Sequence, residues 1–494
     1  MTAGTQHRVD STQGIGGHVT GLRYGGLMTH ASPDDAPHTR AHTCEHVQPA
    51  GSQPPLAAEL EVAQICQDLL RIDTSNYGDD SGPGERAAAE YCAGLLSDAG
   101  CDVDIFEAAP GRTSLVTRIA GVDSSRPALV LHGHTDVVPA QASDWTVNPF
   151  GGEEIDEMLW GRGAVDMKDM DAMILATVRG YLTSGRKPAR DIIVAMFADE
   201  EAGGVHGAQW AVDKRPELFD GASEAISEVG GFSVTLAGRR AYLLQTAEKG
   251  IAWLRLIADG KAGHGSVINP DNAVTALAQA VARIGQHLWP ITLTPTVTQL
   301  LTGIAELTGL AFDPTAEQDH LRQQVDALSA ALGPSAGFVR STAQHTANPT
   351  MLAAGYKANV IPGAAQATID ARLLPGHTDQ GLATLHELAG PGIRVESIHQ
   401  DVALEVPFRG SLVDAMTGAL MDEDPDATVL PYTLSGGTDN KSLSRLGITG
   451  YGFAPLRLPA DLDFVGMFHG VDERVPVESL RFGTRVLDRL LATC

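Results

Sequence analysis

The chain has 494 residues, a formal net charge of −26 at pH 7 and a hydrophobic fraction of 43%. This length favours two or three domains, and the composition suffices for a sizeable core. The negative charge argues against nucleic acid or an anionic membrane as a partner, because both need concentrated Lys and Arg. Five scattered cysteines are typical of reduced thiols, and we find no secretory signal or membrane-spanning apolar run. These features predict a cytoplasmic protein.

The first half of the chain changes from a polar segment to an α/β pattern. Residues 1–53 lack apolar periodicity, so we expect a disordered or misassigned N-terminal extension. From residue 54, helical patterns alternate with short apolar runs that have the character of buried strands. Such alternation predicts an α/β catalytic domain over residues 54–248, with a mostly parallel sheet flanked by helices.

The pattern changes near Gly250. Residues 251–258 alternate like a strand with one exposed face, and two helical segments and a second alternating segment follow. This predicts an inserted α+β lid or dimerisation domain over residues 249–400. The helix and strand pattern of the first part then returns, so residues 401–494 are expected to complete the catalytic domain.

One apolar run ends in a cluster of polar groups. Ala128–Leu131 is followed by His-Gly-His-Thr-Asp, and ligands of open α/β sheets collect beyond the carboxyl ends of strands. His134 and Asp136 point to the same side of an extended segment. The Asp136 carboxylate can therefore hold the second nitrogen of the imidazole or approach the same ion. A solvated loop histidine is the alternative.

Four other segments place acids or an imidazole at similar positions. Asp166 stands in a glycine-rich turn before a helix, where a helix-capping role is the alternative. A buried strand ends in three acids, and its successive residues Glu200 and Glu201 point in opposite directions and should have different roles. Glu228 precedes two glycines, and His469 lies in a glycine-flanked loop.

Taken together, these donors predict a metal centre. The mixed nitrogen and oxygen set suits zinc or a similar divalent ion and consists of His134, Asp166, Glu201, Glu228 and His469. The set is too large for one tetrahedral site, but it suffices for two ions if one carboxylate bridges them. A one-metal site, or Co²⁺ or Mn²⁺ in place of Zn²⁺, stays open.

The order of these motifs resembles a known family. His-x-Asp, Gly-Arg-Gly-x-x-Asp-Met-Lys, Asp-Glu-Glu, Glu-x-Gly-Gly and a late His-Gly occur together in the co-catalytic zinc aminoacylase and carboxypeptidase family. That family contains acetylornithine deacetylase, succinyl-diaminopimelate desuccinylase, aminoacylases and glutamate carboxypeptidase. The resemblance covers roughly residues 56–494 and implies a zinc-binding catalytic domain interrupted by a smaller lid or dimerisation domain.

The resemblance also implies roles for individual residues. His134, Asp166 and Glu228 would hold one zinc ion, and Asp166 would bridge to a second ion held with Glu201 and His469. Asp136 would orient His134, and Glu200 would be the general base that takes a proton from the attacking water. The peptide bond between Asp166 and Met167 would be cis.

Further residues resemble the family's substrate contacts. His264, in Ala-Gly-His-Gly-Ser, resembles the lid histidine that stabilises the oxyanion and in dimers reaches the neighbouring site; a turn histidine is the alternative. Asn359 and Arg372 resemble carboxylate-binding residues, although Arg372 could instead form a surface ion pair. Gly436 and Gly437 resemble a glycine-rich substrate loop, and a plain turn is the alternative.

The resulting hypothesis is a zinc-dependent metallopeptidase or amidohydrolase. Its substrate would be an N-acyl amino acid or short peptide bearing a carboxylate, cleaved with two Zn²⁺ per subunit. A homodimer through the lid domain and a monomer both stay open. These motifs do not separate a deacylase from a dipeptidase or carboxypeptidase. The alternative function is a non-catalytic metal-binding relative that acts as a binding or scaffold protein.

Overall fold

The computed structural model describes residues 56–79 and 81–494, so the expectation for residues 1–53 lies outside the described residues. The helices in this part of the chain are α1 (Ala57–Leu70), α2 (Arg86–Asp98), α3 (Lys168–Ser184), α4 (Ala208–Lys214), α5 (Ala273–Gly285), α6 (Pro295–Thr308), α7 (Gln318–Ala330), α8 (Ala336–Ser341), α9 (Thr378–Ala389), α10 (Ser411–Glu423), α11 (Asn440–Ser444) and α12 (Val477–Thr493). The strands are β1 (Asp104–Ala109), β2 (Arg112–Ile119), β3 (Ala128–His134), β4 (Glu153–Ile155), β5 (Met158–Trp160), β6 (Ile192–Phe197), β7 (Ala222–Ser227), β8 (Phe232–Leu236), β9 (Arg239–Glu248), β10 (Gly250–Asp259), β11 (Gly263–His264), β12 (Thr346–Ala354), β13 (Val360–Ile361), β14 (Ala364–Leu373), β15 (Ile393–Gln400), β16 (Leu404–Glu405), β17 (Thr428–Leu434), β18 (Thr449–Gly452) and β19 (Arg474–Pro476).

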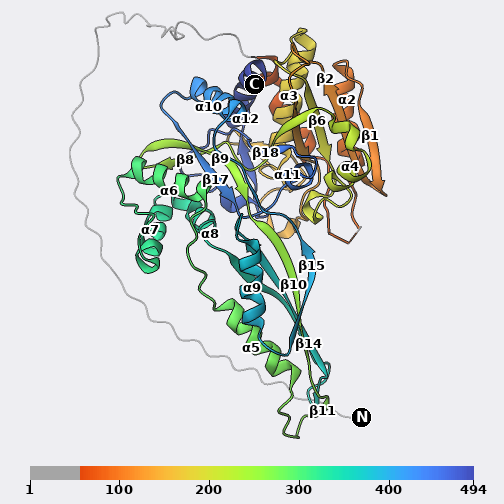
Figure 1. Cartoon of the computed structure of the whole chain (residues 1–494). Coiled ribbons are helices and arrows are strands. Elements are labelled where there is room, and N and C mark those ends of the chain that lie inside the picture. The colour runs from red at the N-terminus through yellow and green to blue at the C-terminus, as the bar shows by residue number, and fades with distance from the viewer. Residues whose placement is uncertain (1–55, 80) are drawn as a thin grey trace, which may run out of the picture. The chain divides into compact units, whose positions relative to one another are not determined.

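A ten-stranded sheet forms the centre of the larger body, which we call the catalytic body (Figure 1). Its order is β1-β2-β6-β3-β7-β18-β9-β16, with β17 and β8 paired to β9. The neighbours β6, β3, β7 and β18 run parallel, whereas β1, β2, β8 and β16 pair antiparallel. The α/β fold class predicted from the sequence is confirmed, and the parallel pairing lies at the centre of the sheet.

Helices cover both faces of this sheet because its central strands are apolar on both sides. In β3, Leu129 and Leu131 pack in the cluster that contains α1, α3 and α12. Ala128 and Val130 point the other way and pack with α4 and α11. The residues of β6 alternate between the same two clusters. This double burial explains the nearly continuous apolar runs in the sequence.

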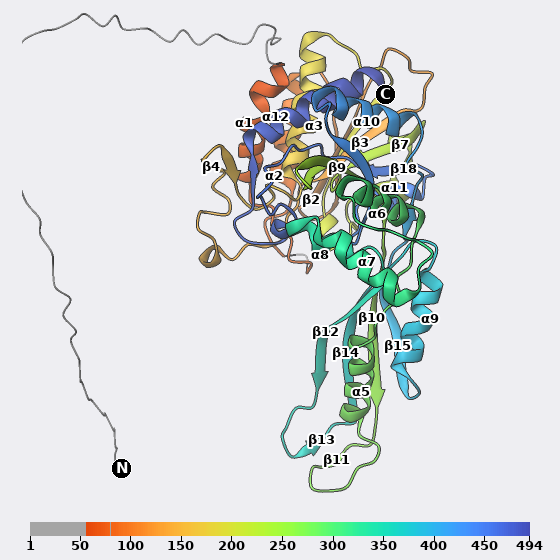
Figure 2. The same cartoon turned by 90° about the vertical axis from the view of Figure 1, so that its left-hand side faces the viewer.

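A second, four-stranded sheet of order β12-β14-β10-β15 lies outside the catalytic body, and we call it the lid sheet. One face of β10 is buried at Leu254 and Leu256, which pack with Leu277 of α5 and Leu385 of α9. The lid sheet and these two helices extend away from the catalytic body, with β11 at the far end (Figures 1 and 2). This arrangement is the inserted α+β lid that the change of pattern near Gly250 predicts.

The helices α6, α7 and α8 belong to a different core from the lid sheet. Leu300, Val325 and Val339 pack in the main hydrophobic cluster of the catalytic body, and α6 lies against β17. The residues between 249 and 400 therefore contribute to two cores rather than one. The domain limits given above stay a prediction.

The sheet topology brings the predicted metal ligands to one edge. The parallel strands β3, β6 and β7 end at His134, Phe197 and Ser227, so their carboxyl ends lie side by side. Polar segments that follow these strands then meet, as is usual in open α/β sheets. No helix among the described residues has the length and apolarity needed to cross a membrane.

Candidate metal centre

The first group of candidate ligands consists of His134, Asp166 and Glu228, all buried. The imidazole Nε2 of His134 lies 3.2 Å from Oδ1 of Asp166 and 3.5 Å from Oε2 of Glu228. His134 is the last residue of β3, and Glu228 follows β7 directly. One donor atom from each residue therefore faces the same small space.

The second group shares Asp166 with the first. Nε2 of His469 lies 3.3 Å from Oδ2 of Asp166 and 3.1 Å from Oε2 of Glu201. Because Oδ1 of Asp166 faces His134 and Oδ2 faces His469, this carboxylate stands between the two groups. The peptide bond between Asp166 and Met167 is cis, which confirms that expectation.

The clustered carboxylates of the two groups repel one another, so the site favours the binding of cations. Burial and the neighbouring Asp166 carboxylate raise the pKa of Glu228 to about 8 and also raise the pKa of Glu201. Oε1 of Glu201 is buried and has no hydrogen-bond partner among the residues that the structure describes. Clustered carboxylates and imidazoles with an unpartnered oxygen match the ligands of divalent ions such as zinc. These residues therefore fit a pair of metal ions.

Asp136 contacts His134 through its backbone carbonyl and the backbone of Glu200 and Glu201 through its carboxylate. Nδ1 of His134 is hydrogen-bonded to the Asp136 carbonyl oxygen at 3.0 Å and lies 3.5 Å from the carboxylate. The carboxylate accepts hydrogen bonds at 3.1 Å from the backbone amides of both Glu200 and Glu201. Asn76, which the sequence did not single out, also donates to it at 2.9 Å. Asp136 thus links the His134 ring to the turn that carries the two glutamates.

Glu200 lies beside the first group. Its Oε2 is 3.9 Å from Nε2 of His134, and its side chain faces the pocket described below. Burial raises the pKa of the Glu200 carboxyl well above its usual value, and the negative charges of Glu228 and Asp439 add to this effect. A carboxyl group with raised proton affinity can accept and return a proton near neutral pH.

A cavity of about 330 Å³ opens onto the two metal groups. The catalytic body supplies the acids, and the lid sheet supplies Trp253, Arg372 and His399. Arg372 lines this cavity and also donates to Asp370 at 2.6 and 2.9 Å, so it forms the ion pair of the alternative, while binding of a substrate carboxylate stays a prediction. Trp253 lies in β10 and His399 in β15, and the alternating polar and apolar sequence of these strands gives no sign of a nearby metal. The sequence therefore did not predict that these two residues line the cavity.

Gly436 and Gly437 also line the cavity. The loop that contains them is held by Thr438, whose backbone amide and hydroxyl donate to the buried Glu248 carboxylate at 3.1 and 2.7 Å. Because Glu248 ends β9, the loop is tied to the central sheet. A Cβ atom at Gly437 would lie 2.6 Å from Nζ of the buried Lys441, so the lysine side chain would have to shift.

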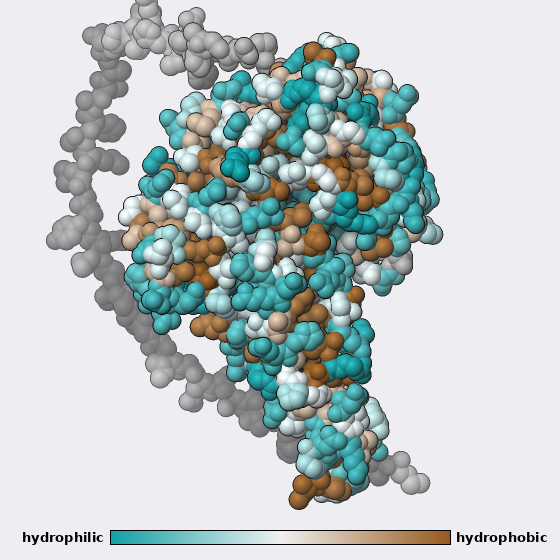
Figure 3. Space-filling model, in the orientation of Figure 1, coloured by the Kyte–Doolittle hydropathy of each residue, from teal (hydrophilic) through white to brown (hydrophobic). Residues whose placement is uncertain are grey.

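Two predicted site residues lie elsewhere. His264 pairs with Val360, and the amide of Gly265 donates to the carbonyl of Asn359 at 2.9 Å, so His264 and Asn359 are neighbours at the far end of the lid. Both are exposed, and neither lines the cavity at the metal groups. Val267 and Ile268 beside them are exposed too, and apolar surface is visible at this tip (Figure 3). The chain does not bring His264 or Asn359 to its own metal groups.

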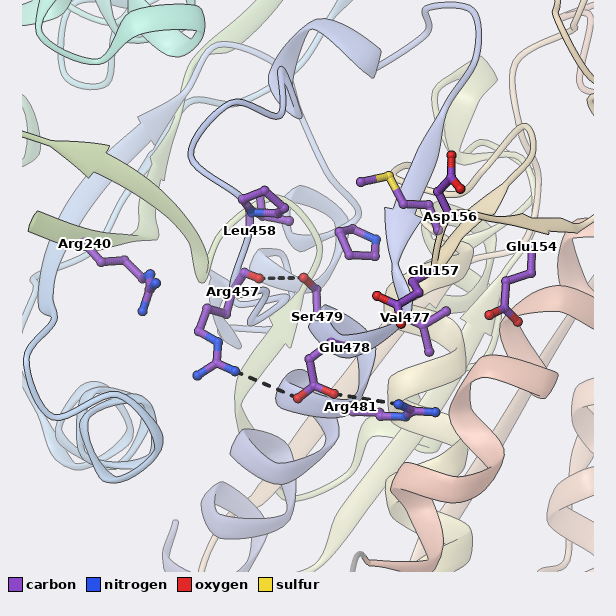
Figure 4. Close-up of a pocket in the computed structure, with 13 residues that line it drawn as sticks. Glu154, Asp156, Glu157, Arg240, Arg457, Leu458, Val477, Glu478, Ser479 and Arg481 are labelled. Atoms are coloured by element: carbon purple, nitrogen blue, oxygen red, sulfur yellow. Dashed lines mark hydrogen bonds and ion pairs between the residues drawn. The ribbon is translucent and has the colours of Figure 1, made fainter. Parts of the chain in front are cut away.

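A larger hollow of about 630 Å³ lies between the β4–β5 hairpin and the start of α12 (Figure 4). Its charged side chains are of both signs, and Glu478 lies 3.9 Å from Arg457 and 3.8 Å from Arg481. Within residues 56–79 and 81–494, neither group of candidate metal ligands lies in this hollow. Both groups of candidate metal ligands found among the described residues border the smaller cavity instead.

The chain matches a family model and individual known proteins. The family model described as Peptidase family M20/M25/M40 matches residues 130–493. The chain is 27% identical over 444 residues to the N-fatty-acyl-amino acid synthase/hydrolase PM20D1 of Xenopus tropicalis, covering 86% of this chain and 84% of that protein. It is 26% identical over 434 residues to aminoacylase-1 of Pongo abelii, covering 86% and 93% of the two chains.

Solved structures share the fold. The M20 family metallo-carboxypeptidase Sso-CP2 from Sulfolobus solfataricus superposes with a TM-score of 0.66 at 17% identity, covering 88% of this chain and 99% of that one. YXEP of Bacillus subtilis, described as a dinuclear metal binding peptidase from the M20 family, has a TM-score of 0.55 at 14% identity, with 88% and 98% covered.

Proposed function

We propose, from the premise that this chain belongs to peptidase family M20/M25/M40, that it is a two-metal hydrolase of N-acyl amino acids or short peptides that carry a carboxylate. Membership of the family confirms the resemblance found in the motifs and makes the protein a hydrolase that acts on amide bonds. It does not favour the alternative of a non-catalytic scaffold protein. The remaining steps concern the metals, the base and the substrate.

Two divalent ions, with zinc as the first candidate, would be held by the two ligand groups. His134, Asp166 and Glu228 would bind one ion, and Asp166, Glu201 and His469 the other. When bound, such ions supply Lewis acidity for the amide carbonyl and for a water molecule. Asp166 is suited to bridging because its two oxygens face different histidines.

Glu200 would act as the general base. Its Oε2 faces the cavity next to His134, and its raised pKa allows it to take the proton of the attacking water and hand it to the leaving nitrogen. The backbone amides of Glu200 and Glu201 donate to the Asp136 carboxylate, and these hydrogen bonds would keep the Glu200 side chain in place. Asp136 is therefore a positioning residue in this scheme.

Arg372 would bind the carboxylate of the substrate, because a guanidinium can form paired hydrogen bonds with it. The glycine loop at Gly436 and Gly437 would offer backbone groups to the same part of the substrate. His264 and Asn359 could reach a metal centre in a homodimer, where the exposed lid tip of one chain meets the cavity of the other. In that arrangement His264 would stabilise the oxyanion.

The observation that carries this proposal is the bridging position of Asp166 between two imidazole and carboxylate groups beside Glu200. The test is a panel of N-acyl amino acids and dipeptides assayed with added Zn²⁺, Co²⁺ or Mn²⁺. Hydrolysis of at least one of these amides, lost on chelation and restored by metal, is the expected result. If no metal supports hydrolysis of any amide in the panel, the proposal is wrong.

A further inference from the structure

One wall of the cavity at the metal groups is apolar. It is formed by four side chains of the catalytic body, namely Val229, Phe338, Leu434 and Phe468. We call these four residues the apolar wall. Val229 follows the candidate ligand Glu228, and Phe468 precedes the candidate ligand His469, so the wall begins next to both metal groups. A group attached to a carbonyl at the metals would therefore lie within reach of it.

Val229 adopts a backbone conformation that its residue type disfavours. Its φ is +55°, in the left-handed region, which is unusual for a β-branched residue. Glycine would adopt this conformation without strain, and Gly230 and Gly231 follow directly in the sequence. The chain nevertheless carries a branched apolar side chain here, and that side chain lines the cavity. Strained residues that persist in folded proteins are concentrated at functional sites.

Phe338 comes from α8, within the helical segment that packs on the catalytic body. Its ring centroid lies 5.5 Å from that of Tyr432, and the Tyr432 hydroxyl donates to the Val229 carbonyl at 3.2 Å. Ser341, at the end of α8, shares a hydrogen bond of 2.8 Å with Ser435, the residue before the glycine loop. The contact with Tyr432 and the hydrogen bond at the end of α8 thus keep Phe338 at the edge of the cavity.

Further aromatic rings support the wall from behind. Phe468 lies 5.4 Å from Phe464, which lies 5.2 Å from Phe232, and Phe232 lies 6.2 Å from Tyr432 (centroid distances). This row of contacts joins Phe468 to the ring against which Phe338 packs. A wall supported in this way keeps its shape, as a specific apolar subsite requires.

We propose that the apolar wall is the subsite for the acyl group and selects aliphatic or aromatic acyl groups over small or charged ones. The inference rests on the proposed function, in which Arg372 on the lid sheet takes the carboxylate of the amino acid. The acyl part is then left to the catalytic body, where the wall lies. Among the described side chains that line this cavity, Arg372 is the one Lys or Arg. The four side chains of the apolar wall carry no polar group, so a second carboxylate on an acyl group placed against them would be desolvated without a partner from the wall.

The experiment compares N-acetyl, N-hexanoyl, N-benzoyl and N-succinyl derivatives of one amino acid, using the full metal-loaded chain. We expect kcat/KM for the hexanoyl and benzoyl substrates to exceed that for the acetyl substrate at least tenfold, and succinyl to be the poorest. Phe338→Ala should lower the hexanoyl-to-acetyl ratio about tenfold, in line with the discrimination of hydrophobic pockets. Phe312→Ala is the matched control, because Phe312 packs on the same core without lining the cavity, and the ratio should stay that of the wild type.

Val229→Gly gives a second test that does not depend on Phe338. It removes part of the wall while relieving the left-handed backbone, so the same ratio should fall without a lower melting temperature. Binding of the four compounds to Glu200→Gln, followed by calorimetry, separates the subsite from the chemistry. No turnover of any of the four compounds by the wild type, together with tight binding of the hexanoyl compound, would contradict the proposed hydrolysis and keep the subsite. Equal ratios in wild type and Phe338→Ala, or equal binding of hexanoyl and succinyl compounds, would overturn the subsite.

Discussion

The metal groups and the lid tip both hold residues that the sequence assigns to one site, yet they differ in burial and in completeness. Within each metal group, the three donor atoms lie within 4.8 Å of one another, and they come from the end of β3 and from segments that connect other strands and helices. At the lid tip, His264 and Asn359 are exposed neighbours that do not line the cavity. Folding of one chain thus assembles the metal half of the site, whereas the lid half would come from a second chain in the proposed homodimer.

The largest effect is expected at Glu200. Glu200→Gln keeps the size of the side chain but removes the group that moves the proton, so kcat should fall by about 10²–10⁴-fold. The metal content measured by mass spectrometry should stay that of the wild type, because Glu200 belongs to neither candidate ligand group. A variant that keeps most of its activity would contradict the assignment of the base.

His264 tests the lid half of the comparison. His264→Ala should lower kcat by about 10²–10³-fold, as expected for the loss of an oxyanion donor, with no change in metal content. Mixing this variant with Glu200→Gln should restore part of the activity, because a mixed dimer contains one site with both groups intact. Lack of any recovery in dimers shown to have exchanged subunits would mean that the lid tip does not act across an interface.

Arg372 connects the two regions. Arg372→Met should raise KM for an N-acyl amino acid about tenfold or more, because a charge-assisted hydrogen bond is worth about 1.5–3 kcal/mol. The same substitution should have little effect on the corresponding N-acyl amino acid amide, which lacks the carboxylate. An equal loss for both substrates would point instead to the ion pair with Asp370 as the main role of this arginine.

The smallest effect concerns His132, buried in β3 beside the metal groups. Burial lowers its pKa to about 4, below the usual 6.5, so the folded chain binds fewer protons than the unfolded chain between these values. Stability linked to His132 is therefore present above pH 6.5 and lost as the pH falls towards 4. The melting temperature of metal-free His132→Gln should depend less on pH over this range than that of the metal-free wild type, and parallel curves would contradict this origin.

The sequence could predict the metal ligands but not the residues that packing between distant segments brings to the site. His134, Asp166, Glu201 and Glu228 follow or precede regular elements with clear apolar patterns, and parallel strands bring such ends together by a general rule. The relation of Phe338, His399 and Glu248 to the site could not be predicted, since it depends on packing between segments far apart in the chain. For the same reason, the sequence did not show that α6 to α8 pack on the catalytic body.

In the proposed centre, Asp166 joins two ligand groups and so holds two metal ions, which a measurement of metal stoichiometry can test. After metal is removed and returned, the full-length wild type should bind two equivalents of Zn²⁺ per chain, measured by calorimetry together with mass spectrometry. His469→Ala should bind one equivalent tightly, since only the second group loses a donor, and Asp166→Ala should weaken both sites. Two tight equivalents in Asp166→Ala, or a single equivalent in the wild type, would contradict the account.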